Sequence, residues 1–152
     1  MRSVSLLLLS ATRPTRLAIY GEDGGVIEQF QSDLPLTESL YDAIKAFDEA
    51  YAIERVLYAR GPGSFMGLKL GYLFLRSFAL GRGIDFLAAD SFALSGGAPI
   101  HSHSKRWFVL ENGSAAIRSF DSAPAEVLSP PERLDLTLFS AETAPNYILS
   151  AV

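Results

Sequence analysis

Hydrophobic positions recur with two different periods along the chain, and the order in which these periods appear predicts an α/β fold. A continuous apolar run from Val4 to Ser10 is typical of a strand that is covered on both faces. Leu40, Ile44, Phe47 and Tyr51 then follow at the spacing of one helical stripe. The predicted elements are strands at 4–10, 16–20, 26–31, 55–59 and 84–88, a helix opened by Pro35 and Thr37, and a helix at 66–80 that stops at Gly81. The order of three strands, helix, strand, helix and strand indicates a mixed sheet.

The last third of the chain predicts less regular structure. Residues 96–104 are rich in glycine, serine and histidine and indicate a linker. A hairpin is expected beyond it, with strands at 105–111 and 115–120, and the proline-containing remainder predicts short strands in irregular chain. We therefore divide the sequence into a first subdomain at 1–97 and a reduced second subdomain at 98–152.

Composition narrows the class of protein. The chain has 152 residues, of which 49% are hydrophobic, and this length suffices for one domain with a real core. It lacks cysteine, which excludes thiol chemistry, and its formal net charge of −4 is spread over both halves without a basic stripe for nucleic acid. The N-terminal apolar run is too short for a secretory signal, and no stretch has transmembrane length. We expect a cytoplasmic protein without membrane contact.

A glycine-rich loop between a predicted strand and a predicted helix carries the most specific pattern. Its residues, 59–69, read Ala-Arg-Gly-Pro-Gly-Ser-Phe-Met-Gly-Leu-Lys. Backbone N–H groups at such a helix N-terminus suit phosphate, but two common phosphate motifs do not fit. A dinucleotide fingerprint needs its third glycine where Met66 stands, and a P-loop needs a glycine directly before the lysine, where Leu68 stands.

This loop resembles the signature of the TsaB (YeaZ) family, which is usually read as Gly-Arg-Gly-Pro-Gly-Ser-Phe-Thr-Gly-Val-Arg. Met66 replaces the usual threonine, and Lys69 replaces the usual arginine. The resemblance fades after Gly97, having continued through Leu80-Gly81, residues 84–88 and Asp90-Ser91-Phe92. It implies the ribonuclease-H-like core of the actin-like ATPase superfamily, a mixed sheet with helices, followed here by a second subdomain smaller than is common in the family.

Catalytic chemistry lacks its usual residues in this sequence. Actin-like ATPases place an acidic residue at the end of the first strand, where this chain has Leu9, so we expect no ATPase site and no metal site. Ser64 does not satisfy the nucleophile motif Gly-x-Ser-x-Gly, because Met66 occupies the last position, and a helix-capping role fits it better. His101 and His103 could bind a metal, but solvated linker histidines are the simpler interpretation. We assign no catalytic residue.

The helix at 66–80 is apolar nearly all round, since its plainly polar residues are Lys69, Arg76 and Ser77. One sheet covers only one face of a helix, so in a domain of this size a partner protein is the natural second cover. Gly67 and Gly71, about one turn apart, would let a partner backbone approach closely. The alternative, that these glycines fit the helix against its own sheet, stays open.

The resemblance implies a non-catalytic subunit that binds and activates TsaD in formation of N6-threonylcarbamoyladenosine on transfer RNA, with TsaE as a further partner and TsaC as the supplier of the adenylate. ATP, Mg²⁺ and a catalytic metal are expected on partner subunits, with no cofactor on this chain alone and only indirect contact with transfer RNA. The same helices are a candidate homodimer surface. The implied partner interface comprises Tyr41, Lys45, Gly67, Leu70, Gly71, Phe74 and Phe78. The signature loop, placed at the interface or near a nucleotide, comprises Arg60, Gly61, Pro62, Gly63, Ser64, Phe65, Gly67 and Lys69.

Two other functions stay open. An independent nucleotide-binding enzyme of the actin-like ATPase superfamily would use the loop from Gly61 to Gly67, and nucleotide binding by the isolated chain would favour it. A homodimeric structural module would have no role in RNA modification. A stable mixed complex with a TsaD protein would favour the supporting subunit over both.

Overall fold

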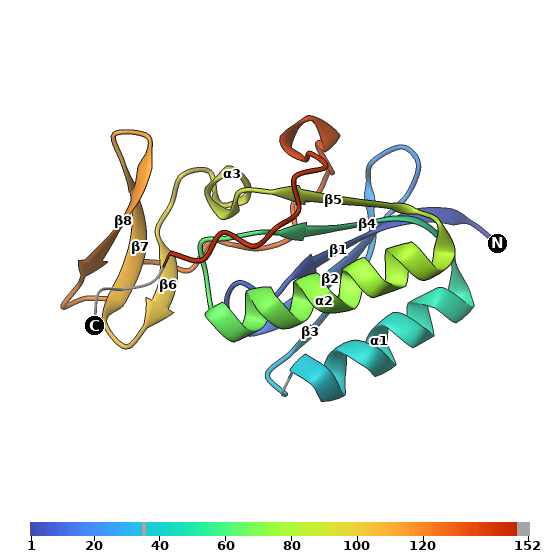
Figure 1. Ribbon diagram of the computed structural model, residues 1–152, viewed down its shortest axis with the longest axis horizontal. Helices are drawn as coiled ribbons and strands as arrows, with labels where there is room; N and C mark the ends of the chain where they lie inside the picture. The colour runs from blue at the N-terminus through green and yellow to red at the C-terminus, as the bar shows by residue number, and fades with distance from the viewer. Residues whose placement is uncertain (35, 149–152) are drawn as a thin grey trace.

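A computed structural model describes residues 1–34 and 36–148 of the chain. Two helices lie against a five-stranded sheet, and a three-stranded sheet lies beyond one end of it (Figure 1). The strands are β1 (Ser3–Leu9), β2 (Thr15–Tyr20), β3 (Val26–Ser32), β4 (Ala52–Ala59), β5 (Asp85–Ala89), β6 (Ile100–His103), β7 (Arg106–Glu111) and β8 (Ser114–Ser119). The helices are α1 (Leu36–Ala50), α2 (Phe65–Arg82), the short α3 (Ser91–Ser95) and a 3-10 turn, η1 (Leu136–Leu138).

The larger sheet has the order β3-β2-β1-β4-β5 and is mixed. β1 pairs antiparallel with β2 and parallel with β4, while β3 and β5 form the outer strands. β1 is central, and Leu6 to Leu9 are at most 1% exposed, as its continuous apolar run requires. The expected order of three strands, helix, strand, helix and strand is therefore confirmed, and the fold is mixed α/β.

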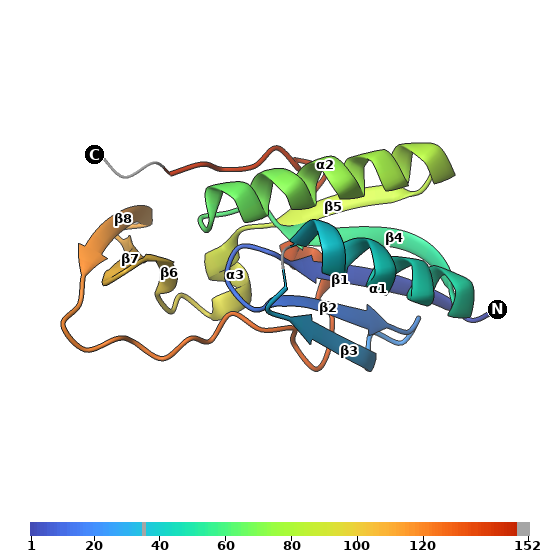
Figure 2. The same ribbon diagram turned by 90° about the horizontal axis from the view of Figure 1, so that it is seen from below.

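α1 and α2 cover one face of this sheet (Figure 2). The buried stripe of helix α2 faces the strands. Ser64 caps the N-terminus of this helix, and its side chain accepts a hydrogen bond from the Gly67 N–H at 3.3 Å. The capping role expected of Ser64 is thus confirmed. The helix ends later than predicted, because Gly83 rather than Gly81 adopts the left-handed conformation that closes it. The buried stripe of α2 consists of Leu68, Gly71, Leu75 and Ala79.

The opposite face of the larger sheet is covered by irregular chain from the C-terminal part of the protein (Figure 2). Leu128 is fully buried there, and the Tyr20 hydroxyl donates a hydrogen bond to the Pro131 carbonyl oxygen at 2.6 Å. Residues 121–148, which the sequence analysis assigned to the second subdomain, therefore lie along the first sheet. Contacts with partners more than 100 residues away in sequence hold Leu128 and Pro131 there, and no local pattern could predict these contacts.

The smaller sheet also differs from the prediction. Residues 100–103, assigned to a linker, form β6, which pairs antiparallel with β7. The expected hairpin is present as β7 and β8, and it turns at Asn112 and Gly113, which both have positive φ. The short helix α3, which the sequence did not predict, is capped by Asp90.

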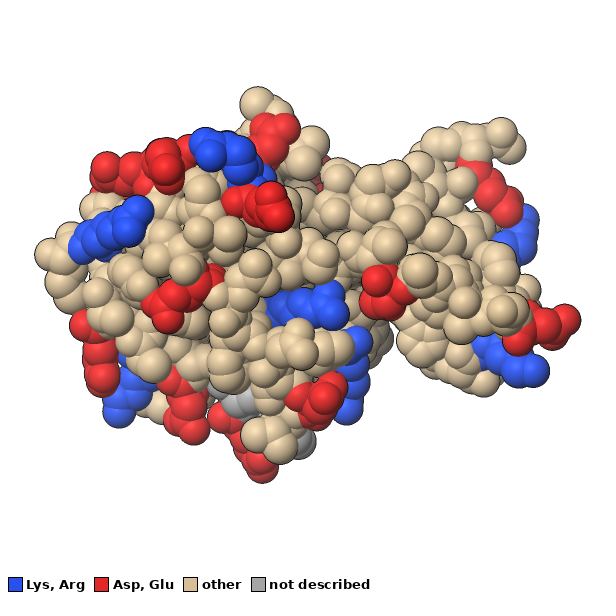
Figure 3. Space-filling view, turned by 180° about the vertical axis from the view of Figure 1, so that it is seen from behind, with Lys and Arg blue, Asp and Glu red and all other residues tan. Residues whose placement is uncertain are grey.

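Charged side chains are spread over the surface. On the face opposite α1 and α2, acidic and basic residues are interspersed and form no continuous basic area (Figure 3). That arrangement agrees with the dispersed charge along the sequence.

None of the helices in the described residues combines the length and apolar character that a membrane span requires.

Candidate partner-binding groove and signature loop

The signature loop is packed tightly against its own chain. Gly61 has a φ of 125°, which few other residues adopt, and a Cβ built on it would overlap the carbonyl oxygen of Asn146. A Cβ on Gly63 would lie 2.5 Å from the Ala11 Cβ, and the Ser64 N–H donates to the Ala11 carbonyl oxygen at 2.7 Å. The glycines of the loop thus make room for the protein's own backbone on these sides.

Residues 140–148, here called the C-terminal strap, bring part of that backbone to the loop. The strap begins beside β5, where Ser140 and Ala88 exchange two backbone hydrogen bonds of 2.9 and 2.8 Å. It then passes Tyr58 of β4, whose hydroxyl donates to the Thr143 carbonyl oxygen. Burial raises the pKa of Tyr58 above its usual value, so this phenol remains a hydrogen-bond donor well into the alkaline range.

Arg60 and Phe65 hold the remainder of the strap. The Arg60 Nε donates to the Ala144 carbonyl oxygen at 2.9 Å, and the Asn146 N–H donates to the Arg60 carbonyl oxygen at 2.7 Å. The Phe65 ring lies 4.7 Å from the ring of Tyr147, between centroids. The strap therefore covers the loop and the flank of α2 that faces away from α1.

The two glycines expected at a partner interface face the protein's own first strand instead. A Cβ on Gly71 would lie 2.6 Å from the Ser10 Oγ, and one on Gly67 would overlap the Ser10 carbonyl oxygen. The Ser10 hydroxyl donates to the Gly67 carbonyl oxygen at 2.7 Å. Gly67 and Gly71 are thus wrongly placed in the predicted interface. The helix was apolar on several sides, so its sequence alone did not show which side meets the sheet.

A groove between α1 and α2 brings together most of the other predicted interface residues. It has a volume of about 190 Å³, and its walls carry aromatic rings, aliphatic carbons and one ion pair. Tyr41, Lys45, Phe74 and Phe78 all line it, whereas Leu70 lies half-buried on α2 outside it. The lining residues are Tyr41, Ile44, Lys45, Asp48, Phe74, Phe78 and Arg82.

The ion pair joins the C-terminal parts of α1 and α2 beside this groove. Both guanidinium nitrogens Nη1 and Nη2 of Arg82 donate to the Asp48 carboxylate at 2.6 Å, and the guanidinium carbon lies 4.4 Å from the centroid of the Phe78 ring. The hydrogen bonds from Arg82 lower the pKa of Asp48. The sequence analysis missed Asp48, although it lies on the helical stripe that Tyr41 and Ile44 begin, at a spacing of seven residues from Tyr41.

An apolar ridge runs along the exposed side of α2. Met66, Leu73 and Leu80 are seven residues apart and therefore lie on one line along the helix. They are 54%, 47% and 73% exposed, although α2 buries its opposite side in the core. We refer to the groove and this ridge together as the α1–α2 face.

The residues that the sequence analysis considered for catalysis or metal binding lie as follows. Leu9, at the end of β1, is buried, so the position of the acid expected in an actin-like ATPase is part of the core. No group of three metal-ligating side chains occurs in residues 1–34 and 36–148. His101 lies in β6, with its ring 4.8 Å from that of Trp107 and its Nε2 2.8 Å from the Ser104 carbonyl oxygen.

Comparison with solved structures identifies the fold. YeaZ from Pseudomonas aeruginosa matches with a TM-score of 0.59 at 19% sequence identity, over 78% of this chain and 65% of that chain. The chain has the YeaZ fold. The structure of an uncharacterized protein with similarity to peptidase YeaZ from Pseudomonas aeruginosa matches with a TM-score of 0.57 at 21% identity, over 88% of this chain and 69% of that one. The chain thus spans about two thirds of the length of these YeaZ-like structures.

Comparisons with protein-family models and with curated proteins gave no match. The YeaZ likeness found by these comparisons is therefore one of structure.

Proposed function

We propose that this protein is a non-catalytic, TsaB-like subunit that binds and activates TsaD during formation of N6-threonylcarbamoyladenosine on transfer RNA. The observation that carries the proposal is the α1–α2 face, which combines a groove lined by Tyr41, Phe74 and Phe78 with a ridge of exposed apolar side chains on α2. A contiguous apolar surface rimmed by charges is typical of a protein-binding site. The YeaZ fold and the signature loop support the identity of the partner.

The finer fold assignment belongs to the same proposal. We infer a ribonuclease-H-like core of the actin-like ATPase type, because the order of strands and helices is the one that such a core has. A supporting rather than catalytic role follows from two features of this core. Leu9 stands in place of the acid that would position Mg²⁺, and the Ser64 N–H, which a phosphate at this helix N-terminus would use, already donates to the Ala11 carbonyl oxygen. ATP, Mg²⁺ and the catalytic metal would then be held by partner subunits, and transfer RNA would be contacted through them.

Two substitutions with matched exposure test the role of the α1–α2 face. Leu73 is 47% exposed on the ridge, and Leu110 is 46% exposed on β7 of the smaller sheet. Leu73→Glu would bury an unpaired carboxylate in the complex, and we expect the affinity for a TsaD protein, measured by calorimetric titration, to fall by about 100-fold or more. Leu110→Glu should leave that affinity unchanged. Both variants should melt at the wild-type temperature, because both positions are at the surface.

The same samples separate the competing functions. Wild-type affinity of Leu73→Glu for TsaD would contradict the proposed interface. Absence of any TsaD complex, together with a wild-type dimer that Leu73→Glu dissociates in sedimentation experiments, would favour a homodimeric module. Micromolar binding of MgATP by the isolated chain would favour an independent nucleotide-binding enzyme. TsaE added to the TsaD complex would show by its own binding enthalpy whether it joins the assembly.

A further inference from the structure

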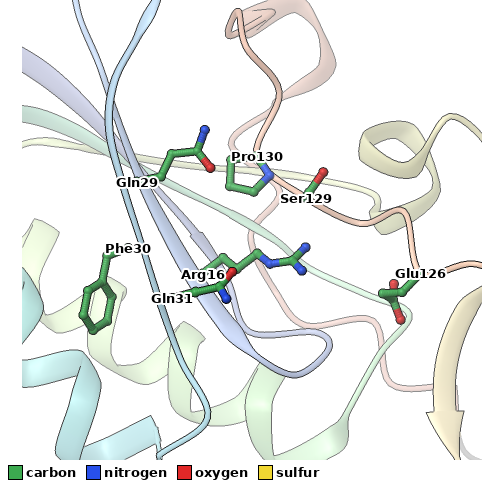
Figure 4. Close-up of a pocket in the computed structure, with 7 residues that line it drawn as sticks. All are labelled: Arg16, Gln29, Phe30, Gln31, Glu126, Ser129 and Pro130. Atoms are coloured by element: carbon green, nitrogen blue, oxygen red, sulfur yellow. The ribbon is translucent and has the colours of Figure 1, made fainter.

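A second, polar pocket lies on the face of the larger sheet opposite the helices. It has a volume of about 460 Å³, is open to solvent, and is lined by residues of β2, of β3 and of the chain at 126–130 (Figure 4). Arg16 points to this face because side chains alternate along β2, and Ala18 and Tyr20 lie in the hydrophobic cluster on the same side. The residues that line the pocket are Arg16, Gln29, Phe30, Gln31, Glu126, Ser129 and Pro130.

Arg16 provides a cation that is oriented but not neutralised. Its Nη1 donates to the Leu128 carbonyl oxygen at 2.7 Å, which fixes the direction of the side chain. A guanidinium has five N–H donors, and no carboxylate of the described residues lies within 4 Å of this one. The guanidinium points toward the side of the pocket on which Glu126 lies (Figure 4). Donors of Arg16 therefore remain available to a group inside the pocket.

Glu126 provides the complementary charge on the other side. Among the described residues, its carboxylate accepts one long hydrogen bond, from the Leu128 N–H at 3.4 Å. Surrounding protein raises the pKa of the Glu126 carboxyl, and this desolvation outweighs the opposing effects of the Leu128 N–H, His101 and Arg16. The side chain of Glu126 is nevertheless exposed, so its carboxylate is accessible to a cation placed in the pocket. An unneutralised cation and an unneutralised carboxylate thus border one cavity without forming an ion pair with each other.

We propose that this pocket binds a small zwitterion that carries one carboxylate and one ammonium group. The carboxylate would bind Arg16, whose planar fork suits two parallel hydrogen bonds, and the ammonium group would bind Glu126. The amides of Gln29 and Gln31 supply donors and acceptors beside this axis. The pocket volume lies within the usual range for small-molecule sites. The proposal is independent of TsaD binding, because the pocket and the α1–α2 face lie on opposite sides of the sheet.

Titration with zwitterions of graded length tests both the site and its class of ligand. Glycine, β-alanine and γ-aminobutyrate differ in the spacing of their two charges, while propionate and propylamine each carry one charge. We expect at least one zwitterion to produce saturable shifts in the backbone amide NMR signals of Gln29, Gln31 and Leu128. Propionate and propylamine should bind about tenfold more weakly or worse, because each forms only one of the two charge-assisted contacts.

Three variants make the result specific to the pocket. Glu126→Gln keeps the shape of the side chain but removes its charge. Arg16→Lys keeps the positive charge but removes the planar guanidinium and its paired donors. Each variant should weaken zwitterion binding by about tenfold. Glu54→Gln, which removes a charge from an exposed position on β4, should leave binding unchanged. Absence of saturable shifts with all three zwitterions would overturn the proposal. Equal binding of propionate, or unchanged binding by Glu126→Gln, would also overturn it.

Discussion

The two faces of the larger sheet are covered in different ways. Helices α1 and α2 cover one face, and most backbone hydrogen bonds of a helix are made within it; on α2 the Gly67 carbonyl oxygen also accepts from the Ser10 hydroxyl, next to the end of β1. Irregular chain covers the other face, and its backbone groups depend on the sheet: Arg16 and Tyr20 donate to the carbonyl oxygens of Leu128 and Pro131. A partner can therefore bind the outer side of the helices without displacing hydrogen bonds between the helices and the sheet. On the opposite face, a partner would have to displace the protein's own irregular chain.

The largest expected effect tests the assignment of the two sides of α2. Gly71→Leu places a side chain where a Cβ alone would lie 2.6 Å from the Ser10 Oγ. We expect the free energy of unfolding of the isolated chain to fall by an amount toward the upper end of about 1–3 kcal/mol, which lowers the melting temperature by several degrees.

Gly81→Leu is the matched control on the same helix, because nothing lies within 4 Å of a Cβ at that position. It should leave the melting temperature unchanged or raise it slightly, since leucine is a better helix former than glycine. A Gly71→Leu chain as stable as the wild type, but weaker in TsaD binding, would return Gly71 to the partner interface.

A smaller effect is expected on the face covered by irregular chain. Tyr20 is fully buried, and Tyr20→Phe would leave the Pro131 carbonyl oxygen without its donor. We expect the free energy of unfolding, measured by urea denaturation, to fall by about 1–1.5 kcal/mol. Tyr41→Phe, at a position 58% exposed on α1, should have no measurable effect. Equal stability of the two variants would mean that the irregular chain does not depend on this bond.

The smallest expected effect concerns the ion pair beside the groove. Arg82 lowers the pKa of Asp48 below its usual value of 3.8, so Asp48 binds fewer protons in the folded state than in the unfolded state at acidic pH. The ion pair therefore stabilises the fold above the usual pKa and loses this effect as the pH falls through the lowered pKa. Both side chains are partly exposed, so solvent screening keeps the effect small.

Asp48→Asn should accordingly lower the melting temperature slightly at about pH 7 and have no effect at about pH 2. The comparison of the two melting curves over this range measures the ion pair. A difference that grows as the pH falls would contradict the assignment. The same ion pair lines the groove, so the variant also shows how much TsaD affinity depends on this pair.

Local patterns in the sequence predicted the elements whose conformation is determined mainly by their own residues. The apolar run of β1, the stripe of α1 and the glycine-rich loop all appear where their residues indicated. β6 was missed because its four residues include two histidines and a serine, and its strand character comes from pairing with β7. The orientation of α2 was missed for a related reason. Its exposed ridge is as apolar as its buried stripe, and only the position of Ser10 shows which side meets the sheet.

The candidate site was predictable to a similar extent. Four aromatic or basic positions expected at an interface, Tyr41, Lys45, Phe74 and Phe78, do line one groove. The roles of Arg60 and Gly61 were not predictable, because their neighbours belong to a strap more than 80 residues further along the chain, and Gly63 and Gly67 face Ala11 and Ser10, about 50 residues before them. The pocket between Arg16 and Glu126 also joins two distant segments, which sequence spacing cannot bring together.

The late position of the irregular chain has a consequence for folding during synthesis. The strands β1 to β5 and both long helices are complete before residue 121 is added, so the helical face can form first. The other face is covered only in part meanwhile, by Phe92, Ile100 and Phe108, and Leu7, Ala18 and Tyr20 on that face contact Leu128 only after the ribosome has released it. Contacts this distant in sequence form slowly, because a long loop must close before they are made. The nascent chain therefore passes through a state in which helices α1 and α2 cover one face of the sheet while apolar side chains on the other face are still exposed and prone to aggregation.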